Sequence, residues 1–136
     1  DQRLSRGLGD VYKRQEISDV VSIHARVTKE TVNLIGKKEI SLMKKDSYLI
    51  NTARGPLLDY KALHDALSNG KLKGAALDTF YEEPLPENHI FKNLNNVTIT
   101  PHIAGASVKT AYYAAEVIAK DVRNYIDGKK LVNRIC

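Results

Sequence analysis

Four polar residues stand where short apolar runs of this chain end, and their side chains could do chemistry together. They are Arg54, Asp78, Glu83 and His102. The apolar runs before them are residues 48–53, 74–77 and 97–101. Each run has the length of a buried strand. A guanidinium, a carboxylate and an imidazole are the groups needed to bind a 2-keto acid and to protonate its carbonyl oxygen.

The predicted strands explain how these groups could meet. In an open α/β sheet, ligands bind in the crevice outside the carboxyl ends of the strands. Each of the polar residues lies at or just past the carboxyl end of its run. Arg54, Glu83 and His102 would therefore converge on one substrate from three successive strands.

Strands alternate with helices along the chain from Glu16 onward. The predicted strands are residues 19–24, 48–53, 74–79 and 97–100, and the predicted helices are residues 36–44, 60–68 and 108–126. Asp59 and Ser107 are the predicted N-caps of the last two helices. Alternation at this spacing is typical of right-handed βαβ units, so the predicted fold class is α/β with a parallel sheet.

Two segments carry further structural predictions. The apolar residues of the last helix recur at intervals of three and four, so we predict that they face inward. They are Val108, Ala111, Tyr112, Ala115, Ile118, Ala119, Val122 and Tyr125. Residues 81–96 are rich in proline, acidic residues and asparagine, which predicts a long surface loop with a solvent-facing His89.

Length and composition exclude several classes of function. The 136 residues suffice for one domain, no run approaches a membrane span, and no signal-peptide pattern is found. The formal charge is +5, but the lysines are scattered, with no aromatic stripe and no zinc spacing. We therefore expect neither nucleic-acid binding nor a metal site. The single Cys136 cannot form an internal disulfide and is compatible with a cytoplasmic location.

Residues 1–15 do not read as part of the fold. They show no sustained period, and residues 10–15 look like the translation of an adapter used in sequencing libraries. We therefore treat residues 1–15 as a non-native, adapter-like segment.

Four segments of the chain resemble the D-isomer-specific 2-hydroxyacid dehydrogenases, the family of phosphoglycerate, glycerate and D-lactate dehydrogenases. The segments are residues 19–24, 49–55, 74–84 and 100–105, in the family's order and spacing. The resemblance implies that residues 16–106 form the C-terminal half of a Rossmann-type NAD(P)-binding domain. Residues 107–136 would be the helix and tail that return to the substrate domain. The glycine fingerprint and most of the substrate domain would precede Glu16.

The resemblance also implies a role for each residue at the predicted sheet edge. His102 corresponds to the acid/base, Glu83 to the carboxylate paired with it, and Arg54 to the substrate-binding arginine. Glu82 is adjacent to Glu83, and the Glu83-Pro84 pattern favours Glu83. Asp78 corresponds to the acid that binds the nicotinamide carboxamide.

The implied cofactor is NAD, and NADP is not excluded because the discriminating acid would lie upstream. The implied cofactor contacts are His24, Ala25, Arg26, Thr52, Ala53, Arg54, Asp78, His102, Ala104 and Gly105. Arg26 stands where many members have proline, which leaves its role open. Gly55 is expected to allow close approach of a ligand or cofactor.

The resemblance implies hydride transfer between NAD(P) and a D-2-hydroxy acid or 2-keto acid, by a longer parent protein that is a homodimer. Two alternatives remain open. One is a dinucleotide-sensing, corepressor-like interaction protein without turnover. The other is that this polypeptide alone is inert, because it lacks the phosphate-binding loop.

Overall fold

The computed structural model describes residues 14–133. The chain divides into two compact units, residues 1–102 and 103–136. The predicted segment 1–15 lies outside the described residues except for Arg14 and Gln15, which belong to a short helical stretch, with the Gln15 side chain buried. Cys136 also lies outside the described part.

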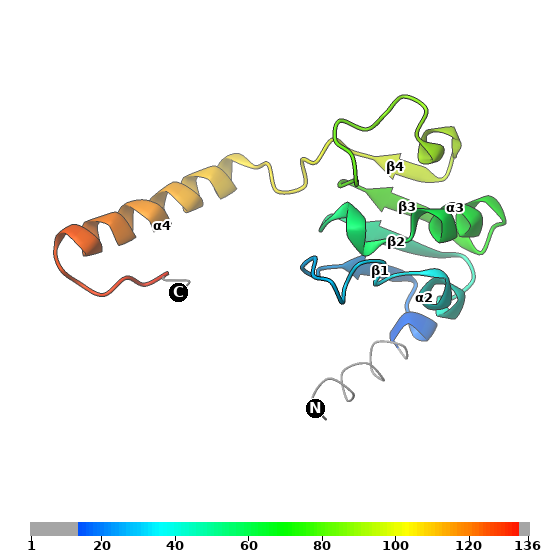
Figure 1. Cartoon of the computed structure of the whole chain (residues 1–136), viewed down its shortest axis with the longest axis horizontal. Helices are drawn as coiled ribbons and strands as arrows, with labels where there is room; N and C mark the ends of the chain where they lie inside the picture. The colour runs from blue at the N-terminus through cyan, green and yellow to red at the C-terminus, as the bar shows by residue number, and fades with distance from the viewer. Residues whose placement is uncertain (1–13, 134–136) are drawn as a thin grey trace. The chain divides into compact units, whose positions relative to one another are not determined.

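The first unit is built on four parallel strands in chain order (Figure 1). They are β1 (Val20–Ile23), β2 (Ser47–Asn51), β3 (Leu72–Leu77) and β4 (Val97–Ile99). All four predicted strands are therefore confirmed, within the usual shift of one or two residues at each end. The parallel α/β fold follows from the βαβ alternation that the sequence carries.

Two helices connect the first three strands and cover the core. They are α2 (Lys37–Leu42) and α3 (Tyr60–Ser68). Since right-handed crossovers join neighbouring strands in chain order, both helices lie on one face of the sheet. The predicted N-cap is present, because the Asp59 carboxylate accepts the Ala62 N–H at 3.0 Å. The buried face of α3 is Leu63, Ala66 and Leu67, as its period of three and four predicts.

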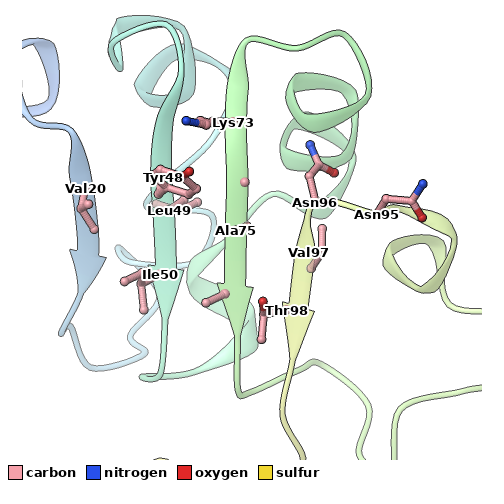
Figure 2. Close-up of a pocket in the computed structure, with 12 residues that line it drawn as sticks. Val20, Tyr48, Leu49, Ile50, Lys73, Ala75, Asn95, Asn96, Val97 and Thr98 are labelled. Carbon is pink, nitrogen blue, oxygen red and sulfur yellow. The ribbon is translucent and has the colours of Figure 1, made fainter.

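The opposite face of the sheet carries a hollow of about 410 Å³ (Figure 2). Tyr48, Lys73 and Val97 are among the residues that line it, and the Lys73 ammonium lies 5.8 Å from the centroid of the Tyr48 ring. None of the predicted site residues lines this hollow. This hollow is therefore part of the open sheet face and is separate from the predicted active site.

The prediction of a surface loop over residues 81–96 is wrong in its second half. A short 3₁₀ helix, η2 (Ile90–Asn93), buries Phe91 completely. His89 caps this helix and lies 5.3 Å, ring to ring, from Phe91, so it is partly buried and does not simply face solvent. Burial, followed by the nearby Lys92 charge, lowers the pKa of His89. The composition of the segment, which is mostly polar, did not indicate that its single phenylalanine, Phe91, is buried.

The second unit contains one long helix, α4 (Val108–Ile126). Its predicted N-cap is present, because the Ser107 hydroxyl accepts the Thr110 N–H at 3.0 Å. The predicted inward face is not buried: no residue of α4 is, although the structure describes every one of them. The periodicity correctly identified an amphipathic helix, but it did not indicate which part of a protein packs against the apolar face. No helix within residues 14–133 is long and apolar enough to cross a membrane.

Gly55 brings the chain after β2 against the chain after β3. A Cβ at this position would lie 2.3 Å from the Phe80 carbonyl carbon and 2.5 Å from the Tyr81 nitrogen. Only glycine permits this approach. The chain's own backbone is therefore one reason for a glycine here, and the expected approach of a ligand or cofactor to Gly55 stays a prediction.

We predict that Gly55→Ala destabilises the chain by about 3 kcal/mol, because the methyl group collides with backbone that cannot rotate away. Urea unfolding followed by circular dichroism measures the change. Gly105→Ala is the control, since a Cβ there meets nothing within 4 Å. Equal unfolding midpoints for the two variants would contradict the prediction.

Candidate active site

The parallel sheet delivers the predicted site residues to one edge. Arg54 follows β2, Asp78 follows β3, and His102 lies shortly after β4. The ladder continues beyond the strands, because the Asp78 N–H donates to the Asn51 carbonyl at 3.0 Å. The Thr100 N–H likewise donates to the Leu77 carbonyl at 3.0 Å. The positions after the strands are therefore held by the same backbone pairing as the strands themselves.

Glu83 and His102 form a hydrogen-bonded pair at this edge. Glu83 Oε2 lies 2.8 Å from His102 Nδ1, and Glu83 Oε1 accepts the Phe80 N–H at 2.8 Å. The hydrogen bond with His102, followed by that of Phe80 and the charge of Arg54, holds the pKa of Glu83 below its usual value. Of the two adjacent acids left open by the sequence, Glu83 is the one that contacts His102.

The backbone of His102 adopts an unusual conformation. Its φ of 55° lies in the left-handed region, which residues with a Cβ enter at a cost. Non-glycine residues persist there where the surroundings fix them, and such residues cluster at functional sites. The conformation supports a role for His102 beyond that of a strand-end residue.

Arg54 sits on a turn shaped by a buried asparagine. The Asn51 side chain donates to the Arg54 carbonyl at 2.9 Å and accepts the Ala53 N–H at 3.0 Å. Asn51 is fully buried, whereas Arg54 and Thr52 are exposed. The Arg54 guanidinium donates to the Ala53 carbonyl at 2.6 Å. Asn51 was not among the predicted site residues, although an asparagine ending an apolar run was the available signal.

Asp78 is buried at the end of β3, with 3% of its surface exposed. The Thr100 hydroxyl, which follows β4, donates a hydrogen bond to Asp78 Oδ1. This bond links the ends of two neighbouring strands and fixes the carboxylate. Thr100 was also missed, because its partner lies far away in sequence.

A cavity of about 500 Å³ opens beside the pair. Its polar lining includes Asp78, Glu83, Lys92 and His102, and the rest is largely apolar. Arg54 does not line it, although its charge acts on Glu83. Within residues 14–133, no three His, Cys, Asp or Glu side chains are grouped to hold a metal ion.

The other predicted cofactor contacts are more dispersed. His24 and Ala25 line a separate hollow of about 580 Å³ beside β1. Arg26 is exposed, and its carbonyl accepts the Thr31 hydroxyl at 2.7 Å. Ala104 and Gly105 belong to the second unit, so their proposed roles stay predictions.

Comparison with known proteins identifies the family. The family model described as "D-isomer specific 2-hydroxyacid dehydrogenase, NAD binding domain" matches residues 7–104. The chain belongs to this family. The match to the 2-hydroxyacid dehydrogenases begins inside the segment 1–15 that the sequence analysis set aside as adapter-like.

Relatives within the 2-hydroxyacid dehydrogenase family carry enzyme names. A glyoxylate reductase of Thermofilum pendens is 47% identical over 122 residues, which are 88% of this chain and 36% of the relative. A D-3-phosphoglycerate dehydrogenase of Methanocaldococcus jannaschii is 39% identical over 91% of this chain and 24% of its own length. The chain therefore spans about a third or less of these relatives.

Solved structures of the family share the fold. The D-isomer specific 2-hydroxyacid dehydrogenase of Xanthobacter autotrophicus Py2, in complex with NADPH and MES, has a TM-score of 0.83 and 30% identity, covering 95% of this chain and 52% of that one. The D-lactate dehydrogenase of Lactobacillus jensenii with NAD⁺ has a TM-score of 0.84 and 29% identity, covering 92% and 42%. Nothing in these relatives favours the corepressor-like alternative.

We predict that Glu83→Gln removes a pH-dependent part of the stability. A carboxyl group whose pKa is lower in the folded than in the unfolded chain stabilises the fold above its unfolded pKa. This contribution is lost as the pH falls through the lowered folded pKa. Urea unfolding between about pH 3 and pH 6 should therefore show a shallower acid decline for Glu83→Gln than for the unmodified chain. Glu82→Gln serves as the control, and parallel declines in all three proteins would contradict the prediction.

Proposed function

We propose that this chain is part of an NAD(P)-dependent oxidoreductase that interconverts a D-2-hydroxy acid and a 2-keto acid. The observation that carries the proposal is the Glu83–His102 pair, at 2.8 Å, with the Arg54 charge close enough to act on Glu83. These groups stand at the carboxyl edge of a parallel sheet, where such folds bind their ligands.

Each of the three side chains has a part in the proposed reaction. The Arg54 guanidinium binds the substrate carboxylate through two parallel hydrogen bonds and polarises the neighbouring carbonyl. Glu83 accepts from Nδ1 of His102, which leaves Nε2 to exchange a proton with the substrate. Nε2–H protonates the carbonyl oxygen as the keto acid is reduced at C2, and Nε2 takes the proton back in the oxidation.

The residues present fit a nicotinamide cofactor. Asp78 is a buried acceptor at the sheet edge, oriented by Thr100, and a carboxamide NH₂ group is a donor that matches it. Asp78, the exposed Thr52 and the half-buried Ala53 of the turn after β2 would hold the cofactor beside His102. When bound, the cofactor supplies or accepts the hydride.

The choice of substrate belongs outside this chain in our proposal. The chain resembles a glyoxylate reductase and a D-3-phosphoglycerate dehydrogenase at 47% and 39% identity, although the two enzymes are named for different substrates. We expect residues 16–106 to supply the chemistry common to both. The part of the parent that pairs with residues 107–136 would select the acid, and the parent would be a cytoplasmic homodimer without nucleic-acid partners.

In the longer parent protein, we predict that His102→Ala lowers kcat by about 10²- to 10⁴-fold, the usual contribution of a general acid.

Arg54→Lys should mainly raise KM, because an ammonium cannot form the two parallel bonds. Oxidation of NADH and NADPH with a panel of 2-keto acids measures both effects. His64→Ala is the matched control, since His64 lies on α3 beside Asp65. Tight dinucleotide binding without turnover on any acid would instead support the sensing role.

For the 136-residue chain alone, we predict no turnover, because the implied glycine fingerprint and substrate domain are contributed by the rest of the parent. The same NADH assay with the purified chain tests this. Dehydrogenase activity that co-purifies with the chain and disappears in its His102→Ala variant would overturn the prediction.

A further inference from the structure

Tyr60, the first residue of α3, stands at the centre of an aromatic cluster beside the turn that carries Glu83. Its ring meets four other rings edge-on, with centroids 4.9 to 6.4 Å away. The rings belong to Phe80, Tyr81, His89 and Phe91. Such arrangements hold an aromatic side chain in one orientation. The Tyr60 hydroxyl is therefore a fixed group, although the residue itself is only partly buried.

The Tyr60 hydroxyl points at the backbone of the Glu83 turn. It accepts the Tyr81 N–H at 3.1 Å. Burial raises the pKa of Tyr60 to about 12, so the hydroxyl is neutral at physiological pH and offers a constant acceptor. No role in catalysis or cofactor binding was assigned to Tyr60 by the sequence patterns.

The next backbone amide completes the link to the site. The Phe80 N–H donates to Glu83 Oε1 at 2.8 Å, while Oε2 of the same carboxylate meets His102. The Phe80–Tyr81 backbone also rests on Gly55, where no Cβ could fit. The Tyr60 hydroxyl therefore binds the Tyr81 amide, and the neighbouring Phe80 amide orients the Glu83 carboxylate.

We propose that Tyr60 is a positioning residue: its hydroxyl fixes the Phe80–Tyr81 backbone and thereby holds Glu83 in the orientation that pairs it with His102. Tyr60 touches neither reacting atom in this scheme and acts only through the turn. The catalytic consequence rests on the proposed function, whereas the orientation of Glu83 can be measured without turnover.

The test is Tyr60→Phe in the 136-residue chain. This change keeps the ring and its contacts and leaves the Tyr81 N–H without its acceptor. We expect exchange of the Tyr81 amide hydrogen to accelerate about five-fold, as for one lost hydrogen bond. We also expect the pKa of Glu83, followed by NMR of its labelled side-chain carboxyl carbon, to rise toward its usual value. Tyr48→Phe is the control, because Tyr48 lies on the open face of the sheet.

The two readouts decide the proposal together. Faster Tyr81 exchange with a raised Glu83 pKa supports it, provided that Tyr48→Phe changes neither. Faster exchange with an unchanged Glu83 pKa overturns it, because Tyr60 would then only steady the turn. An unchanged Tyr81 amide also overturns it. If Tyr60→Phe does not fold, the unmodified chain provides the test. Rapid exchange of its Tyr81 amide refutes the proposal. Protection of that amide together with a lowered Glu83 pKa supports it.

Turnover in the parent separates this proposal from the proposed function. Tyr60→Phe should lower kcat several-fold while KM for the keto acid changes little, because the Arg54 contact is untouched. If the parent turns over no acid at all, the proposed function fails, while the NMR result on Tyr60 stands by itself.

Discussion

The parallel register of the central strands is the constraint on which the site depends. Asn51, Leu77 and Ile99 lie side by side in β2, β3 and β4. The chain segments that carry the polar residues, including Arg54 and His102, therefore leave the sheet at the same edge. A slip of one residue in any strand would turn its side chains to the opposite face and separate the groups. Backbone pairing thus brings together residues that are distant in the sequence, as the proposed chemistry requires.

The fold was accessible from the sequence because its signals are local. Each strand is a short apolar run with a turn signal at its end, and each α-helix carries its own N-cap or period. The same locality explains why the ends of the strands, and with them Arg54, Asp78 and His102, could be placed at one edge. The exposed apolar face of α4 shows where prediction from the sequence stops. Periodicity identifies an apolar helix face, but it does not identify what packs against that face.

The residues that the sequence did not reveal act through long-range contacts. Asn51 shapes the Arg54 turn from inside the core, Thr100 orients Asp78 across two strands, and Tyr60 holds an amide 21 positions away. None belongs to a residue type that signals chemistry by itself. Their importance depends on which groups the fold brings within hydrogen-bond distance, and except for the asparagine that ends an apolar run, the sequence carries no signal for it.

The exposure of the Glu83–His102 pair explains why so much structure surrounds it. Their side chains are 37% and 46% exposed, and ion pairs at such positions contribute little to stability. The attraction between the two groups therefore cannot by itself hold them in one geometry. The orientation must come from neutral, backbone-centred contacts: the Phe80 N–H on the carboxylate, the close approach at Gly55, and the left-handed backbone of His102. An exposed pair fixed in this way would remain open to a substrate while keeping the orientation that the proposed proton transfer requires.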